Sequence, residues 1–244
     1  MVGDPDGILT QMSHTLSVLV PIYNERHTIE RLLRAVCAVD IDADLEILAC
    51  DDGSTDGTRD ILRGLHLPGL RVVFMNENVG RGGVLKHLWT IAMGDILVHQ
   101  DADLEYDPGD FPALLRPILE GEADVVYGSR FKGSIEGMRW LNRVGNLTMT
   151  AACRGLYGVA LSDLMTCYKM YRASLIRDLQ IRANGFDFEA ELTARLAQRG
   201  ARFAEVPVRF SGRTFEEGKK IRAFDAVRVM RELVRCRFTG AAGA

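Results

Sequence analysis

The chain has 244 residues and 47% hydrophobic content, enough for the core of one large α/β domain, and one domain with added segments is expected. Its net charge of -3 provides no general attraction for nucleic acid, which is therefore not an expected partner. The five cysteines contain no C-x-x-C pair, which indicates buried thiols in a reducing compartment such as the cytoplasm rather than a disulfide framework or a zinc site.

Three stretches divide the sequence. Residues 1–14 are aperiodic and contain Gly, Asp and Ser, so we expect a mobile leader. Residues 15–218 are expected to form the main domain, and residues 219–244 a basic amphipathic helix and tail. No apolar run approaches the roughly twenty residues needed to cross a bilayer.

From residue 16, short apolar runs alternate with segments of helical periodicity. We expect strands at Leu16–Ile22, Leu45–Cys50, Arg71–Phe74 and Ile96–His99, and helices at Thr28–Val39, Arg59–Leu65 and Val84–Met93. Such alternation predicts an α/β fold with a mostly parallel sheet that has helices on both faces. Ligands bind beyond the carboxyl ends of the strands in such sheets, and the unusual loops of this chain all follow strands.

The fourth apolar run ends at Asp101-Ala102-Asp103-Leu104-Glu105. Two carboxylates separated by one residue at a strand end can converge on one cation. Taken alone, the pattern is more typical of a strand-to-turn junction, where Asp is common for backbone reasons. The other motifs of the chain favour a metal and phosphate site.

Two glycine-containing loops precede this motif. The loop Asp51–Thr58 carries carboxylates that can accept hydrogen bonds from ribose hydroxyls or a base N–H, although one of its residues can also cap the next helix. The segment Gly80-Arg81-Gly82-Gly83 opens a helix but lacks the spacing of the known phosphate-binding glycine motifs. Alone, it indicates close helix packing.

Four motifs in this order resemble family 2 glycosyltransferases of the GT-A fold, a Rossmann-like nucleotide-diphospho-sugar transferase fold. They are Leu19–Glu25, Asp51–Thr58, Asn78-Val79-Gly80 and Asp101-Ala102-Asp103. Later segments resemble dolichyl-phosphate mannose synthases and bacterial polyprenyl-phosphate glycosyltransferases. They are Asp124–Phe131, Asp163–Lys169, Phe186–Leu192, Glu205–Val208 and Gly212–Lys220. The likeness extends from about Leu16 to Phe238.

The resemblance implies a divalent cation, Mg²⁺ or Mn²⁺, held by Asp101 and Asp103. Glu105 stands where relatives place a Gln in the metal shell, so it is a third expected ligand. The resemblance also implies that the nucleotide-sugar site includes Asp101 together with four residues of the first two loops, Pro21, Tyr23, Glu25 and Asp52.

The resemblance assigns cationic and acceptor-binding residues as well. Arg130 and Arg213 are expected to face the donor phosphates and, with Asp103, to act in catalysis, and Lys219 is expected to bind the nucleotide sugar. Arg143 and Asn146 match the place where relatives hold the acceptor phosphate. For any single arginine taken alone, a solvated surface charge is the more common role.

Glu191 is expected near the N-terminus of a helix, where its carboxylate either interacts with the helix dipole or orients the acceptor or sugar. Hydroxyl acceptors require a base in this region, whereas a phosphate acceptor is already ionised. Glu191 is therefore a catalytic candidate whose role stays open.

These observations predict a hexosyltransferase that moves a hexose, with inversion, from a nucleotide diphosphate sugar to a polyprenyl phosphate. The expected location is the cytoplasm, with peripheral contact to the inner face of the cell membrane through the helix Lys219–Phe238, and a homo-oligomer is compatible with it. That helix can equally pack on the domain with a solvated basic face. The alternatives are transfer to a sugar hydroxyl in surface polysaccharide synthesis and a catalytically silent nucleotide-sugar-binding module. The segment Lys132–Gly137 keeps the hydroxyl-acceptor alternative open, because it lacks the paired glycines that many mannose synthases carry after the Ser-Arg-aromatic motif.

Overall fold

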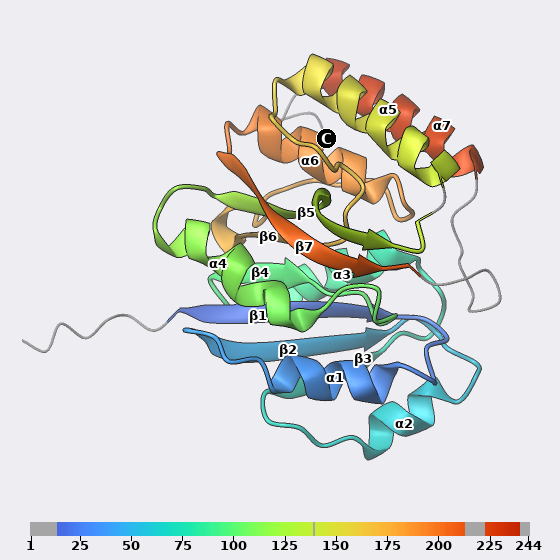
Figure 1. The fold of residues 1–244 in the computed structure, drawn as a ribbon. Coiled ribbons are helices and arrows are strands. Elements are labelled where there is room, and N and C mark those ends of the chain that lie inside the picture. The colour runs from blue at the N-terminus through green and yellow to red at the C-terminus, as the bar shows by residue number, and fades with distance from the viewer. Residues whose placement is uncertain (1–13, 139, 213–222, 240–244) are drawn as a thin grey trace, which may run out of the picture.

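The computed structural model describes residues 14–138, 140–212 and 223–239 of the chain. Within these ranges one seven-stranded sheet has the order β3-β2-β1-β4-β6-β5-β7 (Figure 1). The strands are β1 (Thr15–Ile22), β2 (Asp44–Asp51), β3 (Leu70–Phe74), β4 (Ile96–His99), β5 (Val125–Glu136), β6 (Lys169–Arg172) and β7 (Phe203–Ser211). β6 is antiparallel to β4 and β5, and the other neighbours pair in parallel. The expected mostly parallel GT-A sheet is confirmed.

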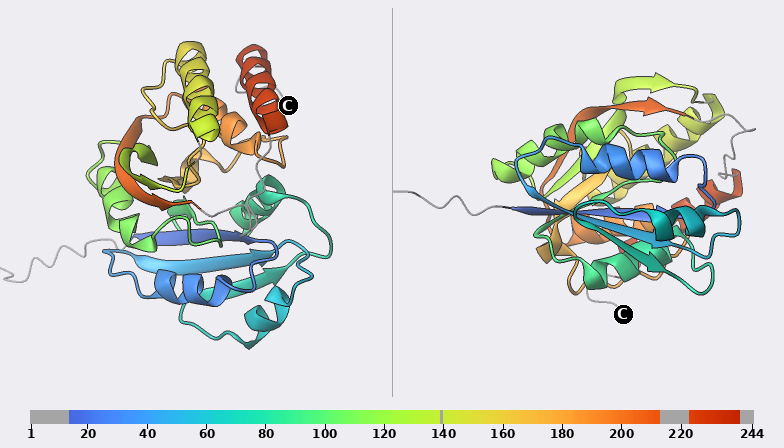
Figure 2. Two further views of the ribbon diagram at one scale, coloured as in Figure 1. Left: turned by 45° about the vertical axis from the view of Figure 1, so that its right-hand side comes forward. Right: turned by 90° about the horizontal axis from the view of Figure 1, so that it is seen from below.

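Helices cover both faces of the sheet. They are α1 (Ile29–Cys37), α2 (Thr58–Gly64), α3 (Arg81–Ile91), α4 (Phe111–Leu119), α5 (Trp140–Tyr157), α6 (Phe188–Gln198) and α7 (Ala223–Phe238). α1 and α4 contribute to the core on one face, and α3 and α6 to the core on the other. Figure 2 shows α5 and α7 together at the end of the molecule farthest from α2. The helices on both faces are as predicted.

The apolar spacing explains why these segments fold as they do. In α1, Ile29, Leu32, Leu33 and Val36 are all fully buried, which is one stripe of a helix at i, i+3, i+4 and i+7. The four residues of β4 are buried on both sides, as expected of a strand in the middle of a covered parallel sheet. The first four strands and three helices lie within three residues of their predicted bounds.

β5 differs from the sequence expectation. The short apolar run Asp124–Tyr127 predicts only a short strand. The observed β5 runs to Glu136 and pairs with β7 again at Ser134 after a shift in register. Gly133 lies so close to β7 that a Cβ there would be 2.1 Å from the Val208 carbonyl oxygen. The partner strand therefore explains the extension, which a short apolar run could not reveal.

α7 packs against α5 and α6 rather than standing away from the domain. Its buried side chains are Val229, Leu233 and Cys236. Of the predicted leader, residues 1–14, residues 1–13 lie outside the described part of the chain. All five cysteines are unpaired, and none of the helices described is long and apolar enough to cross a bilayer.

Candidate active site

Three strand ends meet at one edge of the sheet. Ile22 of β1 is level with Asp51 of β2, and Leu19 of β1 is level with His99 of β4. The loops after β1, β2 and β4 therefore begin side by side. This register brings together the first two predicted nucleotide loops and the Asp101 motif.

Hydrogen bonds join the first loop to the second. The Asn24 backbone N–H donates to Ser54 Oγ at 2.9 Å, and the Thr55 N–H donates to Asn24 Oδ1 at 2.9 Å. The Glu25 N–H donates to Thr58 Oγ1 at 2.9 Å. Asn24 has φ 56°, a left-handed conformation that Asn tolerates better than most residues. The first loop, with Pro21, Tyr23 and Glu25, is thus fixed to the second.

Asp52, the first residue after β2, fixes a third loop, which contains Val79 and Gly80. Its two carboxylate oxygens accept from the backbone N–H groups of Val79 (2.7 Å) and Gly80 (3.0 Å). Burial raises the pKa of Asp52, and the two N–H donors partly oppose this. The side chain predicted to contact nucleotide therefore holds the Asn78-Val79-Gly80 loop in place.

Asp51 was expected only as part of the second loop, yet its carboxylate is distinctive. One oxygen accepts from the Ser54 N–H at 3.1 Å and lies 3.3 Å from Arg59 Nε. The other, Oδ1, is buried with no hydrogen-bond partner among the described residues. A buried acceptor of this kind is costly unless a ligand donor satisfies it.

A chain of alternating charges extends from Asp101. Arg81 Nε donates to Asp101 Oδ1 at 2.9 Å, and Arg81 Nη1 donates to Glu189 Oε1. Glu189 Oε2 accepts from Lys169, which also donates to the Leu164 carbonyl at 2.9 Å. Burial alone would raise the pKa of Glu189, but the Lys169 and Arg81 charges outweigh it and set the pKa at about 2. Glu189 is therefore a permanent anion that anchors both cations.

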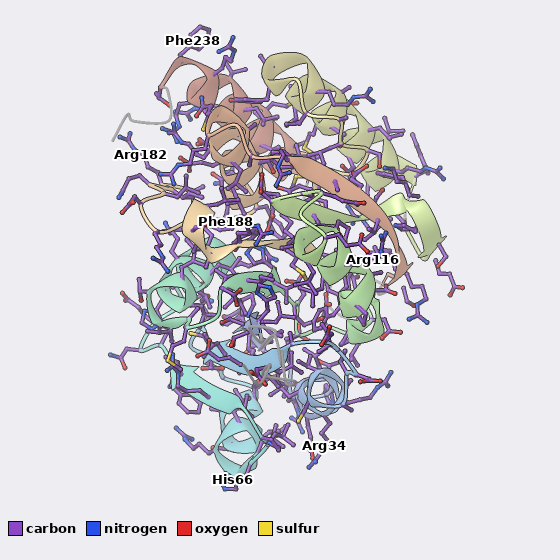
Figure 3. The ribbon with its side chains drawn as sticks, turned by 90° about the vertical axis from the view of Figure 1, so that its left-hand side faces the viewer. Arg34, His66, Arg116, Arg182, Phe188 and Phe238 are labelled. Carbon is purple, nitrogen blue, oxygen red and sulfur yellow. The ribbon has the colours of Figure 1, made fainter. Side chains whose placement is uncertain are left out.

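Four aromatic rings pack together next to these charged side chains, and they are those of Trp89, His99, Tyr171 and Phe188. Tyr171 Oη accepts from Trp89 Nε1 at 2.8 Å and lies within hydrogen-bond distance, 2.6 Å, of His99 Nε2. Burial lowers the pKa of His99 to about 3. Figure 3 labels Phe188 in the interior, and its ring lies 5.4 Å from that of Trp89. His99 is thus a neutral core residue.

The second carboxylate of the motif lies in an irregular turn. The Glu105 N–H donates to Asp103 Oδ1 at 3.1 Å, and Leu104 between them has φ 62°. A left-handed conformation is strained for a residue such as Leu and is often retained at a functional site. In the described part of the chain, the side-chain oxygens of Asp101, Asp103 and Glu105 do not all come within 4.8 Å of one another. A cage of three carboxylates is therefore not preformed.

Two carboxylates are nevertheless a suitable donor set for a hard divalent cation. Mg²⁺ in phosphate-binding sites is usually held by one or two carboxylates, with substrate oxygens and water completing the shell. Asp101 has one oxygen engaged by Arg81, and its side chain is 18% exposed. The residues present thus fit a cation that arrives with a diphosphate.

Arg130 is fixed by a buried carboxylate. Its Nε and Nη2 donate to the two oxygens of Asp163, both at 2.7 Å. Asn146 Nδ2 donates to the same carboxylate at 2.6 Å, and the guanidinium carbon lies 5.1 Å from the centre of the Phe210 ring. Burial alone would raise the pKa of Asp163, but Arg130 lowers it below its ordinary value. Two predicted site residues, Arg130 and Asn146, therefore share one partner that the sequence reasoning did not select.

Within the described part of the chain, two other predicted residues have no bond to Asp163. Arg143 is on the exposed side of α5, where its guanidinium carbon lies 5.7 Å from the centre of the Phe131 ring. Glu191 is fully buried, and its Oε2 accepts from the backbone N–H groups of Arg182 and Ala183, both at 2.9 Å. Its Oε1 accepts from Arg235 of α7 at 2.8 Å. Both carboxylate oxygens of Glu191 are thus engaged by groups of this chain. Arg213 and Lys219 lie outside the described residues.

Sequence reasoning missed the cations and carboxylates that hold the predicted site together. Arg81, Lys169 and Glu189 lay within quoted motifs, but helical periodicity did not reveal that they would meet. Arg81 had one available signal: it stands between glycines directly before a helix and would be costly to bury without a counter-charge. Asp163 likewise opens a motif and is separated by 33 residues from Arg130.

Comparison with known proteins supports this description. Residues 17–180 match the family model of glycosyl transferase family 2. The chain is 32% identical over 218 residues to undecaprenyl-phosphate mannosyltransferase of Micrococcus luteus, covering 82% of this chain and 85% of that one. It is 30% identical over 225 residues to polyprenol monophosphomannose synthase of Mycolicibacterium smegmatis, covering 86% and 82%.

Among solved structures, one of the similar folds is glucosyl-3-phosphoglycerate synthase from Mycobacterium tuberculosis in complex with Mn²⁺, UDP and phosphoglyceric acid. The TM-score is 0.71 with 23% identity, covering 92% of this chain and 79% of that one. At this identity the likeness concerns the fold alone. The family match and the two relatives show more: the chain belongs to glycosyl transferase family 2 and is a glycosyltransferase.

Proposed function

We propose that this enzyme transfers a hexose, with inversion and with the help of a divalent cation, from a nucleotide diphosphate sugar to a polyprenyl phosphate at the cytoplasmic membrane face. The observation that carries the proposal is the register of β1, β2 and β4, which places the Tyr23 loop, Asp51 and Asp101 at one edge. The names of the two relatives supply the acceptor class, undecaprenyl phosphate and polyprenol phosphate.

The nucleotide is proposed to bind over the first two loops. Asp51 Oδ1 is a buried acceptor without a partner among the described residues, so a base N–H or a ribose hydroxyl would satisfy it. Tyr23 directly follows Ile22, the register partner of Asp51, and with 37% exposure it offers an aromatic face between Pro21 and Glu25 in the sequence. Asp52 acts indirectly, by holding the Val79–Gly80 loop.

The diphosphate is proposed to bind at Asp101 and Asp103. A Mg²⁺ or Mn²⁺ ion held there would neutralise charge on the departing diphosphate. The support for a cation is the paired carboxylates and a neighbour of the same fold crystallised with Mn²⁺. Arg81 orients Asp101, and Glu105 is a further candidate ligand that would have to move toward the other two. Arg213 and Lys219 are proposed as further contacts to the donor.

The acceptor phosphate is proposed to meet Arg130, Arg143 and Asn146. Asp163 holds Arg130 and Asn146 in one place, so a cation and an amide donor are preorganised on one carboxylate. An ionised phosphate needs no general base. This agrees with the bonding of Glu191, whose oxygens are already occupied by N–H groups and Arg235.

Contact with the membrane is proposed through α5 and α7. Several apolar side chains on these helices are largely exposed, namely Trp140, Leu141, Val144, Leu147, Val227, Val234 and Phe238. The four on α5 are spaced i, i+1, i+4 and i+7, which places them on one side of the helix. Exposed apolar stripes flanked by arginines are typical of helices that lie on anionic lipid surfaces.

The proposal is tested first by a thermal-shift panel of UDP-, GDP- and dTDP-sugars with Mg²⁺, Mn²⁺ or EDTA. A ligand of the folded state raises the melting temperature, so one nucleotide should act selectively and only with a cation. Transfer of labelled sugar to undecaprenyl phosphate in detergent is then measured. The Asp103→Ala variant is the control.

The same assay separates the alternatives. Transfer to a sugar hydroxyl acceptor, with none to lipid phosphate, would support polysaccharide synthesis instead. Metal-dependent donor binding without transfer or hydrolysis would identify a silent binding module. The connected set of Asp101, Arg81, Glu189 and Lys169 argues against the silent module, because so many buried charges are costly to retain for binding alone.

A further inference from the structure

A charged cavity that is open to solvent lies away from the strand ends, between α7 and the segment that leads into α6. Its volume is about 360 Å³. The residues around it are mostly charged, and they are Arg182, Ala183, Asp187, Arg228, Arg231, Glu232 and Arg235. Figure 2 (left) shows α7 and the segment before α6 next to one another above α3.

The arginines around this cavity outnumber the carboxylates. Arg235 is held by Glu232 and by Glu191. Burial alone would raise the pKa of Glu232, but its pairing with Arg235 holds that pKa below its ordinary value. Arg182 and Arg231 are exposed, and neither has an ion-pair partner in the part of the chain that the structure describes. Positive charge is therefore concentrated around this cavity, although the whole chain has a net charge of -3.

A metal cation is not the expected ligand of this cavity. Glu191, Glu232 and Cys236 come within 4.8 Å of one another, a spacing that a metal would require. However, Arg235 Nη2 lies 2.8 Å and Arg195 Nη2 lies 3.6 Å from Glu191 Oε1, so guanidinium groups already neutralise these carboxylates. Beyond these pairs the cavity is lined by Arg182 and Arg231 and by the single carboxylate of Asp187, so the remaining charge of these three side chains is positive.

The cavity is distinct from the donor site because it lies on another side of α6. Successive residues of a helix are rotated by about 100°, so Glu189 and Glu191 point in nearly opposite directions. Glu189 contacts Arg81 and Lys169 beside Asp101, whereas Glu191 contacts Arg235 and the Arg182 backbone. None of the residues around the cavity belongs to the Asp101 group.

We propose that this cavity binds a phosphate-bearing anion, with Arg182 and Arg231 as the principal contacts. Guanidinium groups form charge-assisted, often paired hydrogen bonds to phosphate oxygens. The anion would join α7 to the 182–187 segment, whose Asn184 carbonyl accepts from the Gly82 N–H at 2.8 Å at the start of α3. The source of the phosphate is either a soluble molecule or the headgroup of an anionic lipid, and both present the same chemistry.

The test uses the full chain in EDTA, so that the cation-dependent donor site does not contribute. Calorimetry measures the affinity for inorganic pyrophosphate, and sedimentation measures binding to phosphatidylglycerol vesicles. The double variant Arg182→Gln/Arg231→Gln is compared with Arg116→Gln, an exposed arginine that Figure 3 shows on the other side of the molecule from Arg182. The double variant should bind at least about tenfold more weakly, because it lacks both guanidinium groups that form charge-assisted hydrogen bonds to phosphate.

The two arms identify the source. Pyrophosphate binding that is lost in the double variant indicates a soluble phosphate ligand, and vesicle binding alone that is lost indicates a lipid headgroup. Absence of both in the wild-type chain, or equal binding by the double variant, overturns the proposal. Unchanged melting temperature and unchanged Mn²⁺-dependent nucleotide binding verify that the double variant is folded and that its donor site is intact.

Discussion

Arg81 and Asp101, twenty residues apart in the chain, form an ion pair in which Arg81 Nε lies 2.9 Å from Asp101 Oδ1. Asp101 follows β4, whereas Arg81 is the first residue of α3. The second charged contact of Arg81, to Glu189 on α6, fixes the guanidinium from the other side. Asp101, the first carboxylate of the Asp101-Ala102-Asp103 motif, is thus oriented by Arg81 of α3, and Glu189 of α6 in turn fixes Arg81.

We expect Arg81→Met to weaken cation-dependent binding of the nucleotide diphosphate by about 10–100-fold, the usual cost of removing a partner that orients a metal ligand. Titration calorimetry with Mn²⁺ measures this. Arg63→Met, which removes an exposed arginine paired with Asp60, should leave the affinity unchanged. Equal affinities for both variants would contradict the assigned role of Arg81.

We expect Asp103→Ala to abolish the part of nucleotide diphosphate affinity that depends on Mn²⁺. The reason is that Asp103 and Asp101 are the two principal carboxylates proposed to hold the cation, and Asp103 Oδ1 also accepts from the Glu105 N–H. Affinity in EDTA should change little, which separates loss of the cation from loss of the fold. Undiminished Mn²⁺-dependent affinity would remove the metal assignment.

The Arg130–Asp163 pair allows a prediction about stability and activity together. Asp163→Asn leaves a buried guanidinium without its counter-charge, so the free energy of unfolding in urea should fall by about 3–5 kcal/mol. Arg130→Lys retains the charge but loses the two parallel hydrogen bonds. If Arg130 contacts phosphate, transfer by the folded Arg130→Lys variant should fall by more than about tenfold. Full activity would show that Arg130 acts in stability alone.

Much of the fold follows from local patterns, and the site follows from them only in part. The α1 stripe and the buried β4 run are readable because their periods are local. The pairing of Arg130 with Asp163 depends on the order of β6, β5 and β7 and on a separation of 33 residues, which no local period encodes. The second half of β5 likewise depends on β7. The motif residues were found, but the partners that hold them were not.

His99 should make stability depend on pH in a defined window. Its pKa is about 3 when folded, below the ordinary 6.5, because the ring is buried. Between these values the unfolded chain binds the extra proton, so the free energy of unfolding falls as pH falls below 6.5, by up to about 1.4 kcal/mol per unit. Glu189 and Asp163 have lowered pKa values and lose their contributions only at more acidic pH.

Urea unfolding between pH 7 and pH 5 measures this slope. His99→Gln, which cannot be protonated but can still bond to Tyr171, should remove most of it. His66→Gln, a change at an exposed position, should retain it. An unchanged slope in His99→Gln would contradict the assignment of a buried, neutral ring.

The apolar stripe of α5 offers the sharpest test of membrane contact. Leu141 and Val144 are 56% and 52% exposed, so changing both to Asp should cost the fold little while placing two negative charges on the proposed lipid-facing side. We expect binding to phosphatidylglycerol vesicles to fall by at least about tenfold, since burial of each such side chain contributes about 1.5–3 kcal/mol and the charges are repelled by anionic lipid. Met93→Asp, at an exposed apolar position after α3, should bind as the wild type does.

Truncation after residue 222 would separately remove α7, with its exposed Val227 and Phe238. If the α5 variant and Met93→Asp sediment equally with the vesicles, the stripe does not meet lipid, and the exposed residues of α7 would then have to account for any membrane contact.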